Sequence, residues 1–521
     1  MPFACIFVPD FPVEALRRID PELRVQAVAV LEGKPPLQKV FAVNAEARRA
    51  GVELGMTKTQ LEACSGLALR TRSSLQEAAA HAALLDCAQS FSPQIEDAGC
   101  GTILLDLAGL ESLFGPVPKI ARALQQRASA LGLEAHVAVA SNPDTAVLAA
   151  RGFSGVSVIP QGKEAEQLKS LPLEVLFAGV SDSDRAQRAS QLLETFSRWG
   201  IGNLHGLAVL PDIALSERLG QEGVRLQQLA RGATFRTLVP VEPPMFFEEA
   251  VELEHPLVLL EPLAFLLNRM LEQLCARLGT RALATQELRL EMKLEQFSHC
   301  HPERTAFVSE GSSIIFRRTL RLPVPLLDSK VFLKLLQLDL AAHPPAAPIR
   351  EIRLAAEPVR PRPAQNGLFL PSSPEPEKLE LTLARIAGMV GAQKAGSLQL
   401  QDTHRREGFL MQRFAPETTG PKPESTQSTV TALRIFRPPA RAAVTMRDGR
   451  PARLACAKPQ SIEGEILWAA GPWRSSGDWW EQAGWARDEW DIALQQEAGI
   501  ALYRLVRDLL SGGWFVEGTY D

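Results

Sequence analysis

The chain has 521 residues, of which 46% are hydrophobic and 22% are charged. This ordinary globular composition excludes wholesale disorder and a coiled-coil rod, and the length predicts about three to five domains. No stretch reaches the ~20 uninterrupted apolar residues that a membrane span needs. Residues 1–10 lack the basic segment of a signal peptide, so we expect a cytoplasmic protein with no membrane partner.

Cysteine usage and net charge narrow the class further. Seven scattered cysteines, odd in number and without a CxxC pair, indicate reduced thiols rather than a disulfide framework or a zinc site. The net charge of −4 does not indicate nucleic-acid binding. One local segment is basic, with six arginines opposed only by Asp448: Arg434, Arg437, Arg441, Arg447, Arg450 and Arg453. On charge alone we interpret it as a solvated linker in preference to a nucleic-acid-binding tail.

The N-terminal part alternates strand and helix patterns. Short apolar runs predict strands at residues 3–8, 37–42, 102–107 and 135–140. Helical patterns lie between or beside them at residues 45–49, 76–91 and 117–131. This order predicts an α+β sheet domain with one helical face.

Residues 192–232 are helical with short glycine breaks. Around Gly200 and Gly202 a helix, a Gly-x-Gly turn and a second helix follow one another, which is the layout of a helix-hairpin-helix. In that motif glycine lets the backbone approach a DNA phosphate, which helix N-terminal amides can hold. A plain turn between two helices fits this segment equally well. Farther on, we expect one long helix at 257–278 and a strand at 287–294.

Proline and tryptophan mark the organisation of the C-terminal third. Six prolines between residues 358 and 376 predict an exposed, extended linker, and 416–428 is a second linker-like run. Seven of the eight tryptophans and both tyrosines lie between residues 468 and 520. Alternating aromatics at 485–490 and 514–520 predict strands of a small β-rich module. Its aromatics suit a packed core, a partner surface or a stacking platform for single strands.

These pieces, in this order, resemble a Y-family (translesion) DNA polymerase over residues 1–350. The sharpest match is AVNAEARRAGVELGM at 42–56, which is similar to the family's fingers segment. The resemblance implies that Arg48 holds the place of an arginine that reaches the incoming nucleotide's phosphates, while Ala45 replaces an aromatic residue. It also implies these parts: palm-like 1–30 and 78–170, fingers-like 31–77, thumb-like 171–237 with the helix-hairpin-helix, and little-finger-like 240–355.

The metal-binding acids of that family are altered here. Polymerases hold two magnesium ions between carboxylates and the nucleotide, and the family supplies D-x-D and S-x-D-E segments for this. The first segment here reads Val8-Pro9-Asp10-Phe11-Pro12, which contains no acid pair in either register. The second reads Gln94-Ile95-Glu96-Asp97-Ala98, and Asp106 lies farther along. We expect a degenerate centre without metal or cofactor; the alternative is an active polymerase holding magnesium on Asp10 with Glu96, Asp97 or Asp106.

The proline-rich linker, residues 356–378, contains Gln365-Asn366-Gly367-Leu368-Phe369. Gln-x-x-Leu-Phe is similar to the pentapeptide that binds the bacterial β sliding clamp. A glutamine at the rim and two apolar side chains in a pocket are typical of such short-peptide recognition. We therefore expect Gln365, Leu368 and Phe369 to contact the clamp.

The tail from Gly471 to Asp521 resembles the C-terminal region of the ImuB group, polymerase-like mutasome subunits whose palm has lost its acids. With it, the resemblance covers essentially the whole chain; residues 379–521 form the C-terminal region and 465–521 the Trp-rich module. It implies a non-catalytic, damage-inducible adaptor that binds DNA and the β clamp. Its implied partners are an error-prone C-family polymerase and a RecA-like, ImuA-type protein. A structural DNA-binding protein without a clamp role is a third hypothesis.

Overall fold

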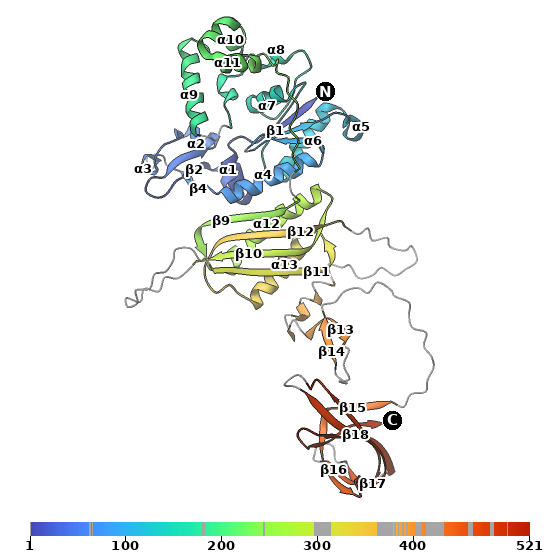
Figure 1. Cartoon of the computed structure of the whole chain (residues 1–521). Coiled ribbons are helices and arrows are strands. Elements are labelled where there is room, and N and C mark those ends of the chain that lie inside the picture. The colour runs from blue at the N-terminus through green and yellow to red at the C-terminus, as the bar shows by residue number, and fades with distance from the viewer. Residues whose placement is uncertain are drawn as a thin grey trace. The chain divides into compact units, whose positions relative to one another are not determined.

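The structure is a computed structural model of the chain, shown in Figure 1. It divides into two compact units, Met1–Met389 and Val390–Asp521. The described residues are 2–61, 64, 66–99, 101–179, 183–242, 245–295, 314–361, a few between 379 and 391, 394–401, 408–412, 432–456, 462–479, 484–497 and 499–521. The predicted α+β class is confirmed, because sheets occur in both units and most described helices lie in the first unit.

The first sheet of the N-terminal unit has five strands in the order β5-β6-β1-β7-β8. Their bounds are Ile95–Asp97, Thr102–Asp106, Phe3–Phe7, His136–Ala140 and Val156–Val158. The central strand β1 runs antiparallel to both β6 and β7. Side chains of β1 alternate between the faces of the sheet, so that Ala4 and Ile6 enter one core and Cys5 another.

Helices cover both faces of this sheet, whereas the sequence pattern predicted one helical face. On one side lie α1 (Phe11–Ile19), α4 (Ser74–Gln89) and α6 (Val117–Ala130), whose apolar residues share a core with Ile6. On the other side α7 (Pro143–Gly152) packs its alanines against Cys5. The small side chains of α7 explain the difference, because they give only a weak amphipathic pattern.

A second, three-stranded sheet has the order β3-β2-β4, with β2 at Ala27–Glu32, β3 at Lys39–Val43 and β4 at Leu67–Thr71. It is flanked by η1 (Pro21–Val25), α2 (Ala45–Arg49) and α3 (Lys58–Leu61). The predicted helix at 45–49 and the strand at 37–42 are found, the latter shifted by about two residues. Strands β2 and β4 were not predicted.

A short helix lies between β6 and β7 of the first sheet, and further helical segments follow the sheet. They are α5 (Glu111–Phe114), α8 (Glu164–Leu168), η2 (Leu173–Leu176), α9 (Ser183–Arg198), α10 (Leu204–Ala208) and α11 (Asp212–Ala230). Phe196, Leu207 and Leu226 from the last three helices pack into one core with α7. The helix–turn–helix order expected around residues 192–232 is therefore present.

The next part is a four-stranded antiparallel sheet in the order β11-β10-β12-β9. Its strands are β9 (Phe247–Leu257), β10 (Ala284–Leu294), β11 (Ile314–Leu326) and β12 (Ile349–Val359), and its helices are α12 (Leu260–Thr280) and α13 (Ser329–Ala342). Leu288, Leu290 and Met292 of β10 are buried with the helices, as the period-2 pattern predicted. Figure 1 shows the two helices lying along one face of this sheet.

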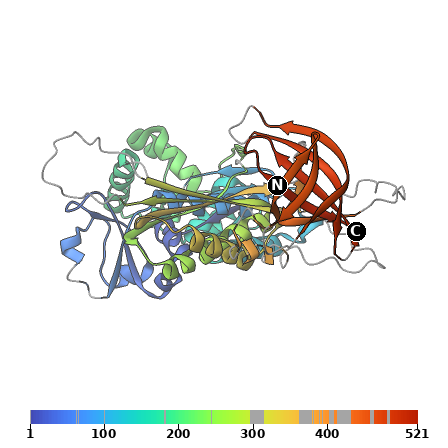
Figure 2. The ribbon, with the colours of Figure 1, turned by 90° about the horizontal axis from the view of Figure 1, so that it is seen from below.

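The C-terminal unit contains a strand pair, β13 (Ser397–Leu400) with β14 (Phe409–Gln412), and a closed barrel. The barrel strands are β15 (Leu433–Arg447), β16 (Arg450–Cys456), β17 (Glu463–Gly477), β18 (Trp485–Gln496), β19 (Gly499–Asp508) and β20 (Trp514–Tyr520). Figure 2 shows these strands wrapped into the barrel. Leu454, Trp490 and Leu505 are among the residues that fill its interior.

Two sequence-based predictions about this region are wrong. The arginine-rich segment from 434 to 453 is not a linker, because it forms β15 and β16 of the barrel. The β-rich module accordingly begins at Leu433 and not at residue 465. The reason is alternation: Ala440, Ala442 and Val444 point inward while Arg441 is exposed, so a strand with small inward residues has a polar composition. No described helix is both long and apolar enough to cross a membrane.

Candidate functional site

The sequence places the candidate centre at the end of β1, where Asp10 follows the strand. Asp10 has a left-handed backbone conformation, φ 47°, and occupies the N-cap position of α1. Its two carboxylate oxygens accept hydrogen bonds from both terminal nitrogens of Arg48, one of them at 2.9 Å. The arginine comes from α2, so the structure does bring Arg48 to the first acidic position. Asp10 is thereby neutralised by a cation of the same chain.

Strand pairing decides which residues flank the end of β1. Phe7 pairs with Thr102, and the backbone nitrogen of Val8 donates to the carbonyl of Gly101 at 2.9 Å. Glu96 and Asp97 lie on β5 instead, where they pair with Leu104 and Ile103. Because β6 lies between β5 and β1, their backbones are about 10 Å from β1, two strand spacings. This strand order does not favour the alternative in which Glu96 or Asp97 holds a magnesium ion together with Asp10.

Asp106 lies at the opposite end of the sheet from Asp10. It pairs with Phe3, the first residue of β1, while Asp10 follows the last one. Phe3 and Phe7, the two ends of β1, are four residue steps apart, which corresponds to about 13 Å. One Asp106 oxygen accepts a hydrogen bond from the Ala108 amide at 2.8 Å. A metal ion held jointly by Asp10 and Asp106 does not fit this geometry.

Glu96 binds a cation that the sequence did not single out. Its carboxylate accepts hydrogen bonds from Nη1 of Arg236 and from the Val239 amide, both at 2.8 Å. Arg236 also donates through Nε to Asp144 in the first turn of α7, at 2.7 Å. Burial lowers the pKa of Arg236, but the hydrogen bonds to both carboxylates outweigh it and raise the pKa overall. Arg236 therefore occupies the position of a counterion to both acids.

Asp97 is held by a histidine and by its own turn. Nε2 of His81, on α4, lies 2.9 Å from one carboxylate oxygen, and the Gly99 amide donates to the other at 2.9 Å. The His81 ring also stands edge-on to Phe11, with centroids 6.2 Å apart. Each acidic side chain expected at the centre thus already has a partner from this chain.

Gly101, beside the end of β1, has no room for a side chain. Its φ is +70°, and a Cβ there would lie 2.8 Å from Cδ2 of Phe11, a side chain that is itself only 5% exposed. Any residue with a carboxylate at this position would have to displace the packed Phe11 ring and adopt a strained backbone. The position nearest the end of β1 on the neighbouring strand is therefore closed to a metal ligand.

The donor set does not fit the two-magnesium centre that a polymerase would use. Two metal ions about 4 Å apart need several free carboxylate oxygens converging on one point. Across the residues that the structure describes, no group of three or more His, Cys, Asp or Glu side chains is arranged to hold a metal ion. Asp10 instead caps α1 and is bonded to Arg48, whereas Glu96 and Asp97 lie on β5 and are bonded to Arg236 and His81.

The other predicted site residues have different outcomes. Gly200, with φ 74°, and Gly202 lie in the turn between α9 and α10, with open space where a Cβ would stand. Asn203 caps α10 by accepting a hydrogen bond from the Gly206 amide at 2.9 Å. This geometry leaves the DNA-phosphate contact of the two glycines a prediction. The clamp-motif residues Gln365, Leu368 and Phe369 lie outside the described residues.

Sequence reasoning missed Arg236, Asp144, His81 and the Gly101–Phe11 contact. The Arg236–Glu96 pair joins residues 140 positions apart, so no local pattern announces it. Gly101 was within reach, because it directly precedes the predicted strand at 102–107 that pairs with the first strand. The prediction instead used the acids at 96 and 97, which lie on the strand before the turn that Gly101 ends.

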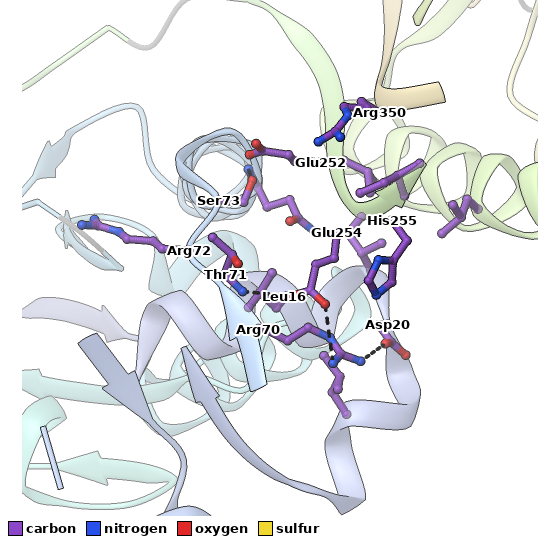
Figure 3. Close-up of a pocket in the computed structure, with 16 residues that line it drawn as sticks. Leu16, Asp20, Arg70, Thr71, Arg72, Ser73, Glu252, Glu254, His255 and Arg350 are labelled. Carbon is purple, nitrogen blue, oxygen red and sulfur yellow. Dashed lines mark hydrogen bonds and ion pairs between the residues drawn. The ribbon is translucent and has the colours of Figure 1, made fainter. Parts of the chain in front are cut away.

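A pocket of about 540 Å³ lies among α1, β4 and β9 (Figure 3). Arg70 stands between Asp20, at 3.6 Å, and Glu254, at 3.9 Å, while the Thr71 amide donates to Glu254 at 2.9 Å. Arg72 is similarly bonded to Glu77 at 2.8 Å. Acids and bases in this wall neutralise one another, so the pocket presents no strong preference for a charged ligand.

Comparison with known proteins agrees with this architecture. Residues 6–151 match the model of the impB/mucB/samB family, a range that contains the β3-β2-β4 sheet and most of the five-stranded sheet, but not β8. Among curated relatives, DNA polymerase IV of Dehalococcoides mccartyi strain CBDB1 is 29% identical over 45% of this chain and 58% of its own length. Protein ImuB of Caulobacter vibrioides is 27% identical over 38% of this chain and 42% of its own length.

The chain thus spans about half the length of these two relatives. Among solved structures, that of DinB from Sulfolobus solfataricus aligns with 70% of this chain and all of its own, at 15% identity and a TM-score of 0.40. An insertion ternary complex of Dbh DNA polymerase aligns at 15% identity and a TM-score of 0.38. The chain is similar to ImuB-type proteins and to DNA polymerase IV, with a strand-rich C-terminal unit in addition.

Proposed function

We propose that the protein is a non-catalytic, DNA-binding adaptor of a damage-induced mutasome. In this role it binds the β sliding clamp and recruits an error-prone C-family polymerase and a RecA-like partner. The observation that carries the proposal is the state of the acids at the palm-like sheet. Asp10 and Glu96 each bond an arginine of the same chain, and Asp106 lies at the far end of β1.

The relatives support two directions. Similarity to Protein ImuB favours the adaptor, whereas similarity to DNA polymerase IV favours an active translesion polymerase with an altered metal site. Catalysis by the second route needs Glu96 and Asp97 to leave Arg236 and His81 and to converge on Asp10. Breaking the partly buried Arg236–Glu96 ion pair and the His81–Asp97 hydrogen bond at once makes that rearrangement costly.

Magnesium-dependent primer extension by the purified chain separates these two functions. The adaptor predicts no extension above background by the wild type, on any template. The polymerase alternative predicts extension that Glu96→Ala/Asp97→Ala abolishes. A Glu111→Ala variant, at the start of the short helix α5 and outside the cluster, controls for an unspecific loss of acidic charge.

Clamp binding rests on the sequence Gln365-Asn366-Gly367-Leu368-Phe369 in the proline-rich segment. Two apolar anchors seated in a pocket contribute on the order of 2 kcal/mol or more each when they are hot spots. We expect Leu368→Ala/Phe369→Ala to abolish measurable binding of the chain to the purified clamp. Asn366→Ala, at a variable position of the motif, should bind as the wild type does. Equal binding by all three proteins would remove the clamp from the proposal.

A further inference from the structure

The arginines of the barrel gather on one hairpin, formed by β15 and β16. These two strands hold six arginines against one acid, Asp448, in a chain whose net charge is −4. Three of the six have partners: Arg434 with Asp521 at 3.5 Å, Arg453 with Glu463 at 3.0 Å, and Arg437. Within the described part of the chain, the exposed side chains of Arg441, Arg447 and Arg450 make no hydrogen bond or ion pair.

Two of these free arginines face one another across the hairpin. Arg447 pairs directly with Arg450, around a turn in which Asp448 and Gly449 have φ values of 50° and 76°. Both values suit a two-residue hairpin turn, so the backbone there is relaxed. Like charges placed opposite one another destabilise a strand pair. The stability of the hairpin therefore does not explain why two arginines face one another, whereas the binding of an external anion does.

The residues between Arg441 and the turn on the outward side include small ones. Ala443 pairs with Ala455, and Thr445 pairs with Arg453, all on the outward side of the two strands. Small side chains leave the strand surface open, while Arg441 and the turn arginines rise at its two ends. An extended chain of phosphates can lie along such a surface and contact both ends.

An exposed aromatic residue lies on β17, the barrel strand that pairs with β16. Trp468 on β17 is 59% exposed, and the neighbouring Leu467 is 55% exposed. Strand β16 runs antiparallel to β17, with Arg453 opposite Glu465. Arg450 precedes Arg453 by three residues and Trp468 follows Glu465 by three, so both lie beyond this pairing on the side of the hairpin turn. The nearest acids on β17, Glu463 and Glu465, lie at the other end of the β16 pairing, beside Arg453 and Ala455.

We propose that this surface, formed by Arg441, Arg447, Arg450 and Trp468, binds single-stranded nucleic acid. Arginines neutralise the phosphates, and the exposed indole stacks on an unpaired base. A duplex keeps its bases stacked inside, so it has no face to offer Trp468. The site shares no residue with the palm-like sheet or with the clamp motif, and the adaptor function does not depend on it.

The first test measures the full-length chain binding a labelled 30-nucleotide oligo(dT) as salt is varied. Arg441→Gln/Arg447→Gln/Arg450→Gln should weaken binding about tenfold at 0.1 M salt and reduce the slope of log Kd against log salt by about 2, because each single-strand phosphate contact contributes about 0.7. The matched control removes three other exposed barrel arginines, Arg434, Arg474 and Arg507. An unchanged slope, or an equal loss in the control, overturns the proposal.

The second test isolates the stacking contact. Trp199 is the only tryptophan outside residues 468–514, so quenching of intrinsic fluorescence by oligo(dT) reports mainly on the barrel. Trp468→Ala should remove part of that quenching and weaken binding about fivefold or more. Trp479→Ala, which removes an exposed indole two residues after the end of β17, is the matched control. If polyglutamate or a duplex of equal length quenches as strongly, the surface binds polyanions in general and the single-strand assignment is wrong.

Discussion

At the scale of single residues, partly buried ion pairs within the chain define the candidate centre. Arg236 bridges Glu96 and Asp144, whose side chains are only 13% and 22% exposed. Partly buried carboxylates without a counterion would be poorly solvated, so the arginine has a structural role of its own. The same contacts leave these acids unavailable to a metal ion.

Replacing Arg236 with alanine should therefore destabilise the N-terminal unit. Two partly buried carboxylates lose their partner, which costs on the order of 1–3 kcal/mol. Urea unfolding followed by far-UV circular dichroism measures the change. Arg198→Ala is the control, because its pair with Glu194 is exposed and should contribute about 0.5 kcal/mol or less. Equal midpoints for the two variants would show that Arg236 is not a structural counterion.

Buried thiols permit a test based on pKa. Burial raises the pKa of Cys5 and of Cys87 to about 12, far above the ordinary value for a thiol. Since the reactive form is the thiolate, both residues should stay unlabelled by iodoacetamide at pH 8 in the native protein and be labelled fully after unfolding in urea. Peptide mass spectrometry reads each cysteine separately. Native labelling of Cys5 would contradict its place in the centre of the sheet.

At the scale of elements, a buried charge network joins α1, α4, β9 and α12. Glu249 is 0% exposed and bonds both Arg18, at 2.5 Å, and Arg277, at 3.1 Å. Arg277 in turn bonds Asp86 at 2.8 Å. These residues connect the five-stranded sheet's helices to the four-stranded sheet within one unit. Such a network holds a specific arrangement, because every charge in it depends on the others.

Breaking this network at its centre should cost far more than breaking a surface pair. Arg277→Met leaves Asp86 and Glu249 buried with one cation fewer, and such a loss typically costs about 3–5 kcal/mol. Arg317→Met removes an arginine whose side chain is 69% exposed in its pair with Glu291, and it should change the free energy of unfolding by about 0.5 kcal/mol or less. Urea titration compares the two. A small effect at Arg277 would mean that water reaches the network.

At the scale of the whole molecule, the chain consists of two compact units with separate apolar cores. The barrel core contains Trp490 and Trp514, and seven of the eight tryptophans lie in the same unit, Val390–Asp521. Most helices lie in the other unit. Fluorescence and the helical circular dichroism signal therefore report on different units.

We expect these two probes to give two distinct unfolding transitions. Domains with separate cores unfold as separate cooperative units, so equilibrium unfolding of the whole chain is not two-state. Arg277→Met should lower the midpoint seen at 222 nm and leave the tryptophan transition unchanged. Coincident transitions that shift together in this variant would show that the units unfold as one.

Local patterns were enough for much of this fold. The helix at Ala45–Arg49, the strand at Thr102–Asp106 and the alternation along β10 follow from apolar spacing, which neighbours in sequence decide. The absence of an acid pair around Asp10 also follows from the sequence, because it depends only on which residues occupy adjacent positions.

Tertiary pairing decided the rest. Strand order placed Gly101 rather than Glu96 beside the end of β1 and sent Asp106 to the far end. Closure of the barrel turned an arginine-rich segment into β15 and β16, because only the enclosed side of each strand needs apolar residues. The Arg236–Glu96 bond and the facing pair Arg447–Arg450 depend on which backbones lie side by side. That arrangement arises from packing between distant segments, so no local spacing of residues specifies it.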